Sequence, residues 1–80
     1  MGARRIVPVT HQTLVRVFEP AGFTVARQKG DHLILTKPGA RRPVVIKAST
    51  CDVPVTHILS NLRTAGMPRR EYLQLLDREV

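Results

Sequence analysis

The sequence predicts one small α+β domain, in the order helix, three-stranded antiparallel sheet, helix and short C-terminal helix. The chain has 80 residues, enough for one domain and too few for two. Hydrophobic residues make up 42% of it and recur at helical spacing near both ends, which favours a compact core. The segments between these two helical regions either alternate apolar and polar residues or are rich in β-branched residues, as strands are. We expect residues 1–8 to form a basic N-terminal arm and residues 9–80 the domain.

The first predicted helix follows Thr10, whose hydroxyl can cap it. Its apolar stripe occupies positions i, i+3, i+4 and i+7, namely His11, Leu14, Val15 and Phe18. Pro20 disfavours helix at the residue before it and Gly22 accepts a left-handed exit, so the helix ends there. On this stripe His11 is expected to be a half-buried structural residue.

Three strands are predicted in the segments 23–28, 31–37 and 43–47. The first alternates apolar and polar residues, and the third is short and β-branched. Lys29-Gly30 and Pro38-Gly39 supply the tight turns between them. Because the loops are short, the strands should pair as an antiparallel meander.

The second helix begins after Pro54, which suits a first turn, and is closed by Gly66. Its apolar stripe is again at i, i+3, i+4 and i+7, namely Val55, Ile58, Leu59 and Leu62. His57 falls opposite this stripe and is expected to face solvent. A last short helix should start near Pro68 and present Tyr72, Leu75 and Leu76. The simplest packing places both long helices on one face of the sheet and leaves the other face open.

The charge of the chain is strongly positive and unevenly placed. Thirteen Lys and Arg stand against six Asp and Glu, a formal +7, and the whole excess lies in residues 1–50. Such a field is typical of proteins that bind nucleic acid. A merely solubilising surface is the alternative. A membrane-surface helix is disfavoured, since the cations do not follow one amphipathic helix.

The second strand contains the candidate catalytic residue. A period of two puts Leu33 and Leu35 on one face and His32 on the other, so His32 stands on the open face if the leucines face the helices. The basic residues expected near it are Arg27, Lys29 and Lys47. A histidine among cations suggests RNA cleavage by the ribose 2′-OH, with imidazole as base and cations stabilising the phosphorus centre. A partly buried structural histidine is the alternative.

Several short segments, in this order and spacing, resemble the HicA toxins, messenger-RNA interferases of bacterial toxin–antitoxin pairs. The segments are Ala21-Gly22-Phe23, Arg27-Gln28-Lys29-Gly30-Asp31-His32, Lys37-Pro38-Gly39, Ile58-Leu59, Ala65-Gly66-Met67 and Tyr72-Leu73. The resemblance implies a fold like a double-stranded-RNA-binding domain. It implies a metal-independent endoribonuclease that cleaves mRNA with a single catalytic histidine, and a HicB-type antitoxin that covers the active face.

The resemblance also assigns roles to residues. His32 matches the catalytic histidine of a Gly-Ser-His step, with Asp31 in place of the serine. This carboxylate either holds the imidazolium form or repels the RNA backbone. Where members often carry a second histidine, this chain has Lys47-Ala48-Ser49. The residues expected to bind RNA are Arg27, Lys29, Lys37, Arg41, Arg42 and Lys47.

Two other function classes stay open: a weakened or inactive RNA-binding module of the same fold, and an interaction protein that docks an acidic partner. No cofactor, metal or membrane is expected, because no metal-ligand spacing and no long apolar run occur. The one cysteine, Cys51, fits a reducing cytoplasm. We expect a cytoplasmic protein that is a monomer when free.

Overall fold

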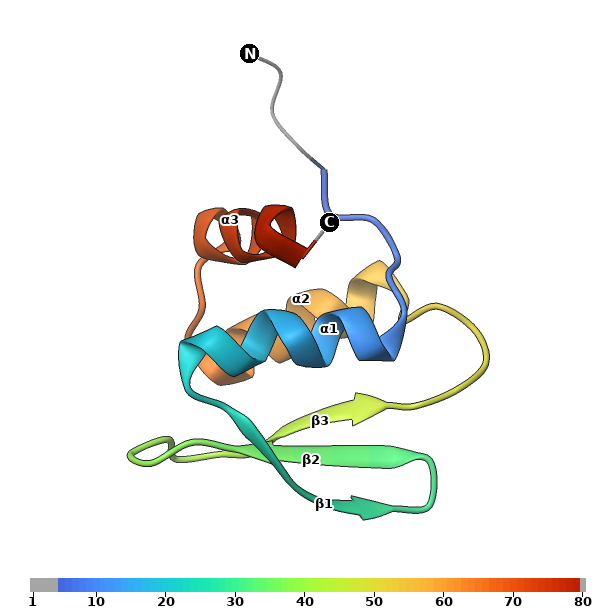
Figure 1. The fold of residues 1–80 in the computed structure, drawn as a ribbon, viewed down its shortest axis with the longest axis vertical. Coiled ribbons are helices and arrows are strands. Elements are labelled where there is room, and N and C mark those ends of the chain that lie inside the picture. The colour runs from blue at the N-terminus through green and yellow to red at the C-terminus, as the bar shows by residue number, and fades with distance from the viewer. Residues whose placement is uncertain (1–4, 80) are drawn as a thin grey trace.

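The computed structural model describes residues 5–79, which form three helices and one sheet (Figure 1). The elements in order are α1 (His11–Phe18), a 3₁₀ turn (Glu19–Ala21), β1 (Thr24–Lys29), β2 (His32–Thr36), β3 (Val44–Lys47), α2 (Val55–Ala65) and α3 (Arg69–Glu79). This order confirms the predicted α+β fold. The last helix, expected to be short, has 11 residues and equals α2 in length.

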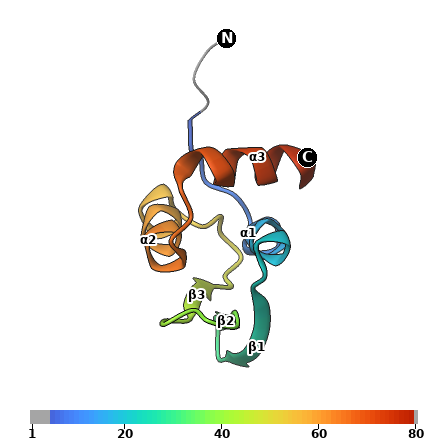
Figure 2. The same cartoon turned by 90° about the vertical axis from the view of Figure 1, so that its left-hand side faces the viewer.

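The sheet is antiparallel in the order β1-β2-β3, so β2 is the middle strand. Figure 2 shows α1 and α2 side by side on one face of the sheet and α3 crossing beyond them. The opposite face of the sheet carries no element of the described chain. The two helices that flank the sheet in the sequence, α1 and α2, therefore cover one face, as the sequence predicts.

The helix boundaries follow from local chemistry. The backbone N–H of Thr13 donates to the Thr10 side chain and caps α1. At the end of α2, Gly66 has φ +69° and its N–H donates to carbonyls of the last turn. A side chain with a β-carbon is strained at this φ, which explains why the helix stops at a glycine.

The core lies between the helices and the covered face of the sheet. Leu35, Val44 and Ile46 supply the sheet side of this core, and all three are fully buried. The stripe predicted for α2 is partly wrong, because Leu59 is 41% exposed. Ile58 and Leu62 of this stripe are buried as predicted, and the third buried residue of α2 is Asn61.

The described residues before α1 pack against the domain. Ile6 is buried in the core, and Val9 forms an isolated antiparallel bridge with Val53. Residues 1–4 of the predicted arm lie outside the described residues. Within the described part of the chain, no helix is both long and apolar enough to span a bilayer.

Tyr72 offers a test of the core. Its side chain is fully buried and its hydroxyl has no protein partner in the described chain. Burial raises the pKa of Tyr72 above its ordinary value of 10.0. As the pH rises, the hydroxyl of Tyr72 therefore loses its proton in the unfolded chain before it does so in the folded one. The free energy of unfolding keeps its full value below about pH 10 and falls as the pH rises through the folded-state pKa of Tyr72.

We expect Tyr72→Phe to leave the free energy of unfolding at neutral pH unchanged, or to raise it by up to about 1 kcal/mol. Above pH 10 the variant should lose less stability than the wild type. Urea unfolding at several pH values measures both effects, and the phenolate absorbance of the chain's single tyrosine follows the titration. An equal loss of unfolding free energy above pH 10 in both proteins would contradict this role of Tyr72.

Candidate active site

A tight hairpin sets the position of His32. Lys29 of β1 pairs with His32 of β2, so only Gly30 and Asp31 form the loop. Gly30 has φ +60° at the first loop position, where a type II′ turn requires a positive value. The Gln28 amide Nε2 also donates to the Gly30 carbonyl at 3.1 Å. His32 is therefore the first residue of β2, directly after the turn.

His32 lies on the open face of the sheet. Leu35 is buried and Leu33 is partly buried beneath the helices, and successive strand residues point to opposite faces. The side chain of His32 is 51% exposed. The predicted placement of His32 is confirmed.

Two lysines flank His32 on the neighbouring strands. Lys29 of β1 and Lys47 of β3 are its cross-strand partners, and such partners share a face with β-carbons about 5 Å apart. Arg27 is paired with Ile34, so it lies on the same face, two residues further along β2. The register thus brings the three predicted cations and the imidazole together. An anion on this face meets positive charge on both sides of the ring.

Asp31 contacts the ring of His32 from the turn. Its Oδ1 lies 2.9 Å from Nδ1, and both side chains are about half exposed. A carboxylate has no proton to offer, so Nδ1 is the donor in this contact and Nε2 is the ring nitrogen that does not face Asp31. Exposed ion pairs add little stability, typically about 0–1 kcal/mol. The contact therefore orients the imidazole more than it stabilises the fold.

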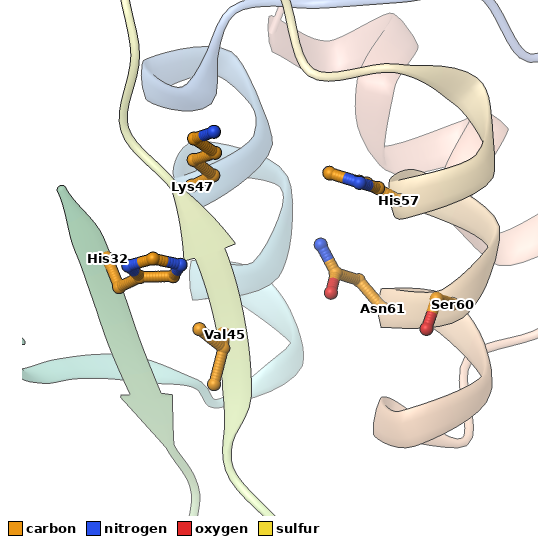
Figure 3. A pocket seen from close by; sticks show the side chains of 6 residues that line it. All are labelled: His32, Val45, Lys47, His57, Ser60 and Asn61. Atoms are coloured by element: carbon orange, nitrogen blue, oxygen red, sulfur yellow. The ribbon is translucent and has the colours of Figure 1, made fainter.

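Helix α2 completes one side of the site. A cavity of about 250 Å³ is lined by His32, Val45 and Lys47 of the sheet and by His57, Ser60 and Asn61 of α2. It forms where α2 packs along β3, one of the two outer strands. Figure 3 shows His57 and Asn61 pointing from α2 toward β3.

His57 is the residue that the sequence analysis missed. It is exposed, as expected, yet it shares a cavity with His32. Its spacing of i, i+4 from Asn61 puts both on one side of α2, which was a usable signal. The neighbouring Asn61 is only 8% exposed, and its Nδ2 has no hydrogen-bond partner in the described chain.

The other predicted RNA contacts lie elsewhere. Arg41 and Arg42, in the loop between β2 and β3, line a separate cavity of about 540 Å³ with Arg63 of α2. The Nζ of Lys37 lies 5.5 Å from the centre of the Phe23 ring, a cation–π contact. His32 is at the start of β2 and this loop follows its end, so the basic residues form two groups at opposite ends of the strand.

The third histidine of the chain, His11, lies away from this site. His11 on α1 lines two other cavities, neither of which shares a residue with the cavity at His32. Across residues 5–79, no group of three or more His, Cys, Asp or Glu side chains is placed to hold a metal ion.

A comparison with known families gives a match. A family model described as the HicA toxin of bacterial toxin–antitoxin systems matches residues 12–67, which is more than half of the chain. The matched segment runs from α1 to just beyond α2 and contains His32, Lys47 and His57. No curated protein matches the chain.

Asn61 provides a test of whether this cavity serves folding or a ligand. An unpaired buried amide costs stability, so we expect Asn61→Leu to leave the free energy of unfolding within about 1 kcal/mol of wild type or to raise it. Leu62→Ala, at the next position and also buried, should cost about 2–4 kcal/mol. Urea denaturation measures both. A large loss for Asn61→Leu would show that the amide is structural.

Proposed function

Because the chain belongs to the HicA toxin family of bacterial toxin–antitoxin systems, we propose that it is a metal-independent endoribonuclease that cleaves mRNA. The observation that carries this proposal is His32 on the open face between Lys29 and Lys47. A histidine is the usual general base near neutral pH, because an imidazole ordinarily titrates near pH 6.5.

In the proposed reaction, Nε2 of His32 removes the proton of a ribose 2′-OH. The 2′-oxygen then attacks the adjacent phosphorus, and the 5′-oxygen of the next nucleotide leaves. Lys29 and Lys47 stabilise the negative charge that grows on the phosphoryl oxygens. Asp31 acts as a positioning residue through its contact with Nδ1. DNA lacks the 2′-OH and is not a substrate for this chemistry.

The two basic groups would hold the RNA strand. Arg27 lies on the same face as His32 and extends the charged surface along β1. Arg41 and Arg42 would contact phosphates further along the strand, at the other end of β2. Lys37, seated against Phe23, would contribute charge to that same end. Each phosphate contact releases counterions, so binding should weaken as salt rises.

We expect a HicB-type antitoxin to silence the enzyme in the bacterial cytoplasm by covering the open face. The family is one of toxin–antitoxin pairs, which implies such a partner. Next to His32 and Lys47, the paired residues Ile34 and Val45 present apolar surface, and Val45 is 44% exposed. An apolar patch beside cations suits a protein partner with acidic and apolar side chains.

The test is cleavage by wild type, His32→Ala and His11→Ala. We expect wild type and His11→Ala to arrest growth on induction and to fragment RNA in vitro. His32→Ala should lower the cleavage rate by about 10²–10⁴-fold, the usual contribution of a general base. EDTA should leave wild-type cleavage unchanged. His11 is the matched control because it lies in other cavities.

Two results would overturn the proposal: equal toxicity of wild type and His32→Ala, or loss of wild-type cleavage on chelation. Salt-sensitive RNA binding by both proteins, with no cleavage products from wild type, would instead identify an RNA-binding module. Failure to retain RNA at low salt would identify a surface for an acidic protein.

A further inference from the structure

Three elements bring two imidazoles and one ammonium group to the same cavity. His32 comes from β2, Lys47 from β3 and His57 from α2, and all three line the space of about 250 Å³ (Figure 3). This volume lies just below the usual range for small-molecule pockets, about 300–1,000 Å³. β3 lies between β2 and α2, so the two histidines approach the cavity from different sides.

The proposed cleavage requires two proton transfers, and His32 performs only one. A base must take the 2′-OH proton, and an acid must protonate the 5′-oxygen, because an alkoxide is a poor leaving group. With Nδ1 facing Asp31, His32 has one nitrogen for the reaction. A second proton donor is therefore needed on the side of the leaving oxygen, and histidine is the side chain that most often supplies one.

We propose that His57 is the general acid of this reaction, an inference that rests on the proposed ribonuclease function. The 2′-OH proton passes to Nε2 of neutral His32 while the bond between the 2′-oxygen and phosphorus forms. The bond between phosphorus and the 5′-oxygen breaks, and the His57 imidazolium gives that oxygen its proton. The products carry a 2′,3′-cyclic phosphate and a 5′-hydroxyl, and exchange with water restores both rings.

Asn61 supplies an independent sign that this cavity takes a ligand. It is more than nine-tenths buried, its Nδ2 has no partner in the described chain, and its amide points into the cavity beside His57 (Figure 3). A buried N–H donor that makes no hydrogen bond lowers the stability of the fold, so its presence indicates that a ligand atom accepts from it. A phosphoryl oxygen held by Lys47 would be such an acceptor.

The cavity has few other groups that would complicate the pH dependence. The titratable residues facing His57 are His32 of β2 and Lys47 of β3, and Asp31 acts through its contact with His32. An ammonium group stays charged across neutral pH. Cleavage should therefore follow a bell-shaped pH profile, since one ring must be neutral and the other protonated.

The experiment compares two RNAs of the same sequence, one of them with sulfur replacing the 5′-oxygen at a mapped cleavage site. A thiolate leaves without a proton. We expect His57→Ala to slow cleavage of the normal RNA by about 10²–10⁴-fold, to lose the alkaline limb of the pH profile, and to cleave the sulfur-containing RNA nearly as fast as wild type. His32→Ala should be slow on both RNAs, and His11→Ala should match wild type.

Each other outcome has a definite meaning. If His57→Ala cleaves both RNAs like wild type, or is equally slow on both, His57 is not the acid and this inference fails while His32 keeps its role. If wild type cleaves neither RNA, or His32→Ala cleaves like wild type, the proposed function itself fails. His57 is exposed, so its removal should leave the fold intact, and the unfolding midpoint checks this.

Discussion

The packing of Leu33 and Leu35 against the core beneath the helices is the constraint on which the site depends. Side chains alternate along a strand, so burying these two leucines forces His32 to the open face. A slip of one residue in register would turn His32 inward and expose the leucines. The tight turn at Gly30 and the pairing with β3 hold this register and place a lysine on each side of the ring. The fold thus determines the electrostatics of the site.

The position of α2 creates a cavity at the edge of the sheet, beside β3. A three-stranded sheet by itself offers a flat surface, which binds a polyanion but does not exclude water from a reacting phosphate. Because α2 packs along β3, residues of the helix form a wall beside Lys47. The core holds this wall through Ile58 and Leu62, on the face of α2 that also carries Asn61. One helix therefore serves both packing and the site.

Local pattern was enough to predict the elements, the sheet topology and the face of His32. The strand period and the turn glycines are local signals, and they determine which side chains share a face. The missed features are tertiary. The cavity that His57 and His32 share depends on how α2 is rotated against β3, and the predicted stripe through Leu59 implied a rotation that the exposure of Leu59 contradicts. The separation of Arg41 and Arg42 from His32 likewise follows from strand length and loop direction, not from charge counting.

The proposed reaction requires RNA to cross the open face at the end of the sheet that carries His32. The most direct measurement titrates ¹⁵N-labelled protein with an RNA whose cleavage site has a 2′-deoxy sugar, which removes the nucleophile, and maps the amide chemical shifts. The account predicts the largest changes at Lys29, His32, Lys47 and His57. Changes confined to α3 and the outer side of α1, with none at His32, would contradict it.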